Sequence, residues 1–292
     1  MKKRLLLFCL WIFPVAAYAQ KELPLEPAIL ECKYVFVMHT DTITRSRVVQ
    51  DTVLQRIGEN ISQFINCYTF ILDTLEASPQ DYSKEILSKI HNGGFRHSII
   101  SNVNEYIYKN YLSGKTTTMS QEFIAGFYFE EEYQPQSWIL LPDSTRQILN
   151  RECLLATCDF RNRTYFAWYC PEIPISDGPW KFFGLPGMIL ELYDTNKDYH
   201  FVAFQMETEN LTPVTLYNFD EEEYIQTDRK TYINTQYKRR SGVATEEIPL
   251  LRNLYWKGRE KNLTSLSPQA SSIRFYGKGL LNPVDCTVYA HL

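Results

Sequence analysis

Three carboxylates in or beside a glycine- and proline-rich stretch, residues 173–194, are the first candidates for chemistry. They are Glu172, Asp177 and Glu191. Two carboxylates held about 5–10 Å apart across a cleft can share the acid and base or nucleophile roles of a hydrolysis reaction. These residues therefore raise the hypothesis of a hydrolase, which a cleft containing two of them would support.

The motifs of other catalytic classes are missing from the sequence. The five histidines show no metal-ligand spacing such as H-E-x-x-H, and there is no P-loop, G-x-G-x-x-G or G-x-S-x-G motif. Asp194, Asn196 and Asp198 match the first positions of a calcium loop, but Tyr199 and Gln205 replace its glycine and glutamate. We therefore predict a hairpin turn there, no metal and no cofactor, and we favour a non-catalytic function.

Aromatic residues in the same region are candidates for binding an apolar ligand or a protein partner. Trp180 lies between Pro179 and Lys181 in a loop of turn-forming residues, and we expect it to be exposed, whereas we expect Trp168 in the core. The candidate surface comprises Trp168, Tyr169, Ile173, Pro174, Gly178, Pro179, Trp180, Phe182, Phe183, Gly184, Leu185, Pro186 and Gly187.

The elements that position these residues are predicted to be mostly β. Alternating runs predict strands over 31–42, 42–58 and 62–77, and hairpins from 127 to 204. A helix is predicted over 78–94, and residues 220–240 form a charged helix or an extended arm. The expected fold is mostly β (α+β), a strongly bent antiparallel sheet or half-barrel with a few flanking helices.

The first nineteen residues resemble a secretory signal peptide. Three cations precede an apolar run that is too short to span a bilayer, and Ala17-Tyr18-Ala19 predicts cleavage after Ala19. No later run predicts an integral membrane span. Residues 20–292 are predicted to form a single domain, with a core over 30–238 and a strand-and-turn tail over 239–292.

The charge balance disfavours a nucleic-acid partner. The chain has 30 Lys and Arg against 34 Asp and Glu, and the signal peptide contains three of the cations and no acid. The remainder has 30 − 3 = 27 cations and 34 acids, a net charge of −7. Binding to phosphate needs a basic face, so nucleic acid is not expected as a partner.

Six cysteines follow the signal peptide, an even number that permits disulfides in an exported chain. If the hairpin over 150–171 turns on Asn162 and Arg163 as a two-residue loop, Cys153 and Cys170 form a diagonal pair on one face. A three-residue loop instead places Cys158 with Cys170, too far apart to bond. The Cys153–Cys170 disulfide is therefore a register-dependent hypothesis, and free thiols are the alternative.

The stretch "AWYCPEIPISDGPWKFFGLPGMILELYD" resembles the signature of the GLPGLI family of exported proteins, found largely in Bacteroidota. The motif runs from Gly184 to Ile189, with Met188 where the family has leucine. The preceding "ECLLATCDFRNRTYFAWY" is similar to a second family block, with Leu155 replacing its lysine and Asn162 its glycine. Cys170 stands where threonine is common, so a family-wide disulfide is not implied.

The resemblance implies a compartment more than a chemistry, because the family's function is largely uncharacterised. It implies the periplasm or the periplasmic face of the outer membrane, or secretion, and an outer-membrane or periplasmic partner such as a TonB-dependent receptor. The expected fold is also similar to lipoprotein carriers of the LolA/LolB kind, in which a bent sheet covers an apolar cavity. The leading hypothesis is a non-catalytic envelope protein that binds an apolar ligand or an outer-membrane partner. The alternatives are an envelope hydrolase and a purely structural assembly factor.

Four short sequences resemble the D-[ST]-apolar/Thr signal for protein O-glycosylation in Bacteroidota. The acceptor residues would be Thr42, Thr52, Thr74 and Ser144. Asp-Thr pairs are also ordinary at strand edges and turns, so glycosylation is a hypothesis for intact-mass measurement.

Overall fold

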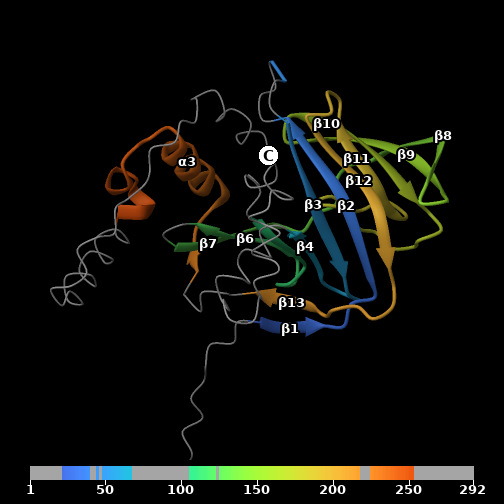
Figure 1. The fold of residues 1–292 in the computed structure, drawn as a ribbon, viewed down its shortest axis with the longest axis horizontal. Helices are drawn as coiled ribbons and strands as arrows, with labels where there is room; N and C mark the ends of the chain where they lie inside the picture. Colours follow the sequence, from blue (N-terminus) through green and yellow to red (C-terminus); the bar gives the residue numbers. More distant parts are fainter. Residues whose placement is uncertain are drawn as a thin grey trace, which may run out of the picture.

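The computed structural model describes residues 22–39, 44–45, 48–67, 105–122, 125–217 and 224–252 (Figure 1). The predicted signal peptide, the helix over 78–94, Thr42, Thr74 and the tail beyond residue 252 lie outside these ranges.

The described strands fall into two sheets. The large sheet has twelve strands in the order β14-β7-β6-β5-β4-β3-β2-β12-β11-β10-β9-β8, and the small sheet pairs β1 with β13. The strand bounds are β1 Glu22–Glu26, β2 Leu30–His39, β3 Val48–Ile57, β4 Ser62–Asn66, β5 Glu105–Lys109, β6 Lys115–Glu122, β7 Ala125–Glu132, β8 Ile139–Ile148, β9 Arg151–Phe160, β10 Arg163–Cys170, β11 Met188–Asp194, β12 Tyr199–Glu207, β13 Val214–Tyr217 and β14 Ile225–Gln226.

The large sheet is strongly bent and does not close into a barrel (Figure 1). Its strand pairs are antiparallel except for β14 with β7. The predicted mostly β fold with a bent antiparallel sheet is therefore confirmed. Two helical elements belong to the described chain, α3 (Arg229–Arg240) and the short 3-10 helix η1 (Thr245–Glu247).

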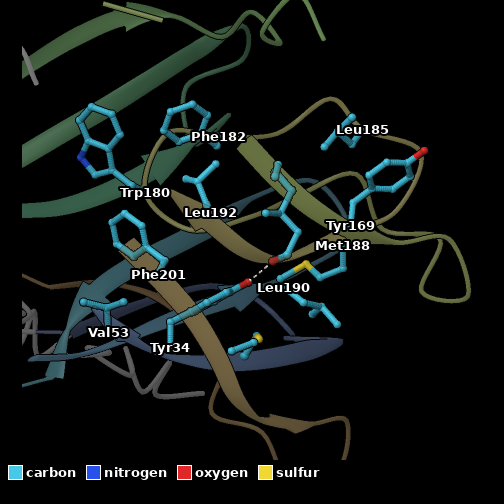
Figure 2. Packing of buried hydrophobic residues seen from close by; sticks show 14 of the residues in the cluster. Tyr34, Val53, Tyr169, Trp180, Phe182, Leu185, Met188, Leu190, Leu192 and Phe201 are labelled. Atoms are coloured by element: carbon cyan, nitrogen blue, oxygen red, sulfur yellow. Dashed lines mark hydrogen bonds between the residues drawn. The ribbon is translucent and has the colours of Figure 1, made fainter. Parts of the chain in front are cut away.

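Alternation along the strands turns one face of the sheet toward the main core. In β2 the buried side chains include Tyr34, Phe36 and Met38, and their neighbours in sequence are half-buried. Phe36 stacks on Phe201 of β12 with the ring centroids 4.4 Å apart. The hydroxyl group of Tyr34 donates to the carbonyl oxygen of Ile189 at 2.7 Å, so the core is also fixed by a hydrogen bond (Figure 2).

Two smaller clusters complete the packing. Strand β13 contributes Tyr217 to a cluster with Leu54 and Tyr108 of the large sheet. Helix α3 starts at the N-cap Asp228, whose carboxylate accepts from the backbone of Thr231, and it packs on β7. The charged segment that was predicted as a helix or an arm is therefore helical over 229–240.

Residues 133–138, which we call the strap, connect the two ends of the bent sheet. They run from β7, the second strand of the order, to β8, the last. The indole N–H of Trp138 donates to Phe183 O at 2.9 Å, and the amide group of Gln136 donates to Lys181 O at 3.1 Å. The strap therefore covers the glycine- and proline-rich stretch that contains the G-L-P-G motif.

Candidate functional site

The loop over residues 173–187, which we call the motif loop, lies inside the molecule rather than on its surface. Trp180 is 6% exposed, and Phe182 and Leu185 are each 1% exposed (Figure 2). The ring of Phe182 lies 4.6 Å from that of Tyr165 and 5.1 Å from that of Phe160. The prediction that Trp180 is exposed is therefore wrong, because the loop fills the space between the sheet and the strap.

Most of the other predicted surface residues are also buried. Trp168 is half-buried against the core, and only Pro174, Gly184 and Pro186 are exposed. The remaining candidates are buried, namely Tyr169, Ile173, Gly178, Pro179, Phe183, Leu185 and Gly187. Most side chains of the motif loop therefore form part of the core.

Lys109, the last residue of β5, fastens the motif loop to the sheet. Its ammonium group bonds the carboxylate of Asp177 and donates to Gly178 O at 2.8 Å and to Phe182 O at 3.3 Å. The Lys109 side chain is 1% exposed, and burial lowers its pKa while the Asp177 carboxylate acts in the opposite direction. The paired charges explain how an aspartate is tolerated in the core.

A second buried lysine ties the motif loop to β7. The ammonium group of Lys181 lies 2.5 Å from the Glu131 carboxylate, 4.8 Å from the centre of the Phe129 ring and 5.5 Å from that of Trp180. Arg161 bonds the same carboxylate at 2.6 Å and lies 5.0 Å from the Trp180 ring. The motif loop is thus held from β7 and from the β9–β10 turn.

The lowered pKa of Lys181 predicts a measurable pH dependence. Burial lowers this pKa to about 8. Between pH 8 and the ordinary value of 10.5, the unfolded chain holds a proton that the folded chain has released, so Lys181 adds stability as pH rises. Buried thiols act in the opposite direction, since burial raises the pKa of Cys32 and Cys158 to about 12. The contribution of Lys181 to the pH dependence is therefore measured as the difference between the wild type and a variant that lacks this lysine.

We expect the unfolding free energy of the wild type, minus that of Lys181→Met, to increase from about pH 7.5 to about pH 9.5 by roughly 1 kcal/mol or more. Urea denaturation at both pH values measures it. An equal difference at the two pH values would show that Lys181 keeps its ordinary pKa.

The three carboxylates of the hydrolase hypothesis are held by different cations. Glu172 is exposed and lies 3.2 Å from Arg151, whereas Asp177 is buried with Lys109. The carboxylate of Glu191 bonds Arg146 and lies within hydrogen-bond distance, 2.8 Å, of the imidazole Nε2 of His200. Asp177 lies in the motif loop and Glu191 lies on the opposite face of the sheet, so the structure does not bring these two together.

The acidic hairpin connection over 194–198 is a turn closed by arginines. Arg163 bonds the carboxylates of Asp194 at 2.6 Å and Asp198 at 3.0 Å, and Arg45 bonds Asp198 at 2.8 Å. The predicted hairpin between β11 and β12 is confirmed. Within the part of the chain that the structure describes, no group of three His, Cys, Asp or Glu residues is arranged to hold a metal ion.

The β9–β10 turn differs from the prediction by one residue. Arg161 and Asn162 form the two-residue loop, with φ of 51° and 62°, and Phe160 pairs with Arg163. Paired residue numbers therefore sum to 323, which places Cys153 directly opposite Cys170 and not diagonal to it. Both are buried free thiols, the thiol of Cys153 donates to Arg151 O at 3.7 Å, and burial raises the pKa of Cys153 to about 12. The described cysteines thus contain no disulfide.

Of the two predicted glycosylation acceptors within the described ranges, Thr52 lies in β3 and Ser144 in β8, and both are half-buried. None of the described helices is long and apolar enough to cross a membrane.

The face of the sheet opposite Tyr165 and Ala167 was not anticipated as a site, although Trp168 on this face also packs against the main core cluster. Strand pairing aligns two rows of side chains across β8, β9, β10, β11, β12 and β2, and we call these rows the outer face. The first row is Ile139, Thr157, Phe166, Tyr193, His200 and Val37, and the second is Leu141, Leu155, Trp168, Glu191, Val202 and Val35. Of these twelve side chains, Glu191 alone is buried.

Aromatic and charged groups gather near the middle of the outer face. Phe166 stacks on Tyr193 at 5.6 Å, and Tyr193 meets the His200 ring edge-on at 5.5 Å. The Arg146 guanidinium lies 5.9 Å from the Trp168 ring while bonding Glu191. Alternation along "RTYFAWYC" contained the signal, since Phe166 and Trp168 must oppose the buried Tyr165 and Ala167.

Comparison with known proteins places one stretch of the chain. The profile of a protein family described as a protein of unknown function (Porph_ging) matches residues 159–191, which include β10 and the motif loop. This family is associated with Bacteroidota. The comparison with curated proteins returned no match.

Sixteen chains of solved structures also match. Two crystal forms of PNGF-II, in space groups C2 and P21, have TM-scores of 0.47 and 0.46 at 13% identity. Each match covers 72% of this chain and 33% of the PNGF-II chain, so the chain spans about a third of the length of those proteins.

Proposed function

We propose that this chain is a non-catalytic binding protein of the bacterial envelope, which docks on a protein partner through the outer face. The observation that carries the proposal is the partial exposure of two rows of mostly apolar and aromatic side chains on one side of the sheet, with Ile139 at its end exposed. The motif loop does not supply such a surface, because its aromatic residues are buried.

The composition of the outer face supports a protein partner. Trp, Tyr and Arg residues dominate the binding energy of protein interfaces, and Trp168, Tyr193 and Arg146 lie together here. The charge on Glu191 is already balanced by Arg146, so the patch can be covered without leaving that carboxylate unpaired. Phe204, which is 46% exposed, extends the apolar surface along β12.

The sequence supports the cellular setting of this proposal. A signal peptide cleaved after Ala19 would export the chain. The resemblance to the GLPGLI family favours the periplasm or the periplasmic face of the outer membrane as its location. A receptor of a TonB-dependent transport system is the partner class that the family resemblance favours. An apolar small molecule held in a carrier-like cavity is less supported, since aromatic side chains of the motif loop fill the space beneath the strap.

Replacing Trp168 with alanine tests the proposal. We expect this variant to lose about 1–3 kcal/mol of binding free energy, a weakening of roughly fivefold to 150-fold, because a central aromatic contact is removed. The measurement is quantitative cross-linking and mass spectrometry of the protein in the native envelope, with bound small molecules analysed in the same samples.

The matched control is Tyr237→Ala in α3, because that tyrosine is 53% exposed and lies outside the outer face. Its partners should be recovered as in the wild type. Equal recovery of the same partners by Trp168→Ala would refute the assignment of the outer face. A bound apolar molecule lost from neither variant would point to the carrier alternative.

A further inference from the structure

Strand β8 forms one end of the twelve-stranded sheet, and none of the described strands pairs with its outer edge (Figure 1). Two consecutive side chains of this edge are large, apolar and exposed, Ile139 at 63% and Leu140 at 47%. Proteins usually protect such edges with charges, proline or bulges, because an open edge can pair with another strand. Here Pro142, Asp143 and the irregularity between Leu141 and Thr145 interrupt the middle of β8, but Ile139–Leu141 has no such protection.

From this edge we infer that two copies of the chain associate, with β8 of one copy antiparallel to β8 of the other around a two-fold axis at Leu140. This proposal does not rest on the function assigned to the outer face. It commits to a second copy because antiparallel pairing centred on Leu140 brings apolar side chains of the two edges together.

That register pairs residues whose numbers sum to 280. Leu140 then faces Leu140 of the second copy, Ile139 faces Leu141, and Trp138 faces Pro142. Asp143 faces Ser137. This register therefore avoids placing like charges opposite each other, which would destabilise the pairing. A shift of two residues to a sum of 282 would place Asp143 opposite Ile139.

The parity of the register also matches the faces of the sheet. Paired residues of antiparallel strands lie on the same face, so an even sum joins the outer face of one copy to that of the other. Ile139 and Leu141 end the two outer-face rows, and pairing would make these rows continuous across the dimer. An odd sum would place the outer face of one copy beside the core-facing side of the other.

The stretch of strand pairing is short, so the dimer should be weak and should depend on protein concentration. Sedimentation equilibrium or light scattering of the purified protein over a concentration series measures it. In Leu140→Lys, the two ammonium groups would face each other across the axis, and we expect the dissociation constant to rise by about tenfold or more.

Two further variants make the test specific. Val48→Lys, which changes an exposed apolar residue far along the sheet order, should dimerise as the wild type does. Leu140→Glu alone should be as weak as Leu140→Lys, and an equal mixture of the two should form a heterodimer. A wild type that stays monomeric at all concentrations, or a Leu140→Lys variant that still dimerises normally, would overturn the proposal.

Discussion

Replacing Lys109 with methionine should lower the free energy of unfolding by about 3–5 kcal/mol. The change leaves the Asp177 carboxylate in the core without its cation, and Gly178 O and Phe182 O lose a donor. The hydrogen bond from Gly178 N to Asp177 at 2.6 Å remains, but it does not neutralise the charge. Burying an unpaired carboxylate is the dominant cost.

Urea denaturation of the wild type and the variant measures this loss. Lys115→Met is the matched control. Lys115 is a strand lysine that is also paired with a carboxylate, that of Glu132, but its side chain is 37% exposed. Its pair is screened by solvent, so the Lys115 variant should unfold at nearly the urea concentration of the wild type. The double variant Lys109→Met with Asp177→Asn should recover part of the loss, since it removes both charges. If the Lys109 variant is as stable as the Lys115 variant, the buried pair is not what fastens the motif loop.

The bent antiparallel sheet could be predicted because its strands alternate. In "RTYFAWYC" and in the hairpin around Asp194–Asp198, one face is apolar and the turn residues are polar, so strand type and hairpin pairing follow from local sequence. The β9–β10 turn was misplaced by one residue. Arg161 and Asn162 both adopt left-handed conformations, and a two-residue turn on Asn162 and Arg163 was equally compatible with the residue types.

The burial of the motif loop could not be predicted from local composition. Glycine and proline usually mark exposed turns, and Trp180 lies among them. Its surroundings come from distant parts of the chain, since the strap covers the loop and Lys109 bonds Asp177 across 68 positions of sequence. The lysine ends the short strand "EYIYK" and has no sequence feature that marks it as buried.

The outer face could be predicted from the sequence only in small part. Its rows depend on the register of six strands, and only the Phe166 and Trp168 positions could be read from alternation alone. The contacts of Arg146 with Glu191 and Trp168 require the order of β8 to β11 in the sheet, which the sequence does not state. The predicted surface and the outer face therefore have Trp168 in common and no other residue.

Replacing Trp180 with alanine should destabilise the protein by about 3–5 kcal/mol, the cost of removing a large aromatic side chain from a core. The ring packs against Phe160 and Phe182 at centroid distances of 6.0 Å and 5.9 Å. It also separates two cations, Arg161 and Lys181, each of which loses a cation–π contact in the variant. The Glu131 carboxylate would remain bonded to both, so the loss should come mainly from the cavity.

Phe204→Ala, an aromatic truncation at an exposed position, is the control and should change the unfolding free energy by less than about 1 kcal/mol. Thermal or urea denaturation separates the two variants, and partner recovery by Trp180→Ala is then measured well below its unfolding transition. Because Trp180 is buried, we expect the folded fraction of this variant to bind as the wild type does, whereas Trp168→Ala should fold but bind more weakly by about 1–3 kcal/mol. A Trp180→Ala variant with wild-type stability and lost binding would reverse these roles and return the binding site to the motif loop.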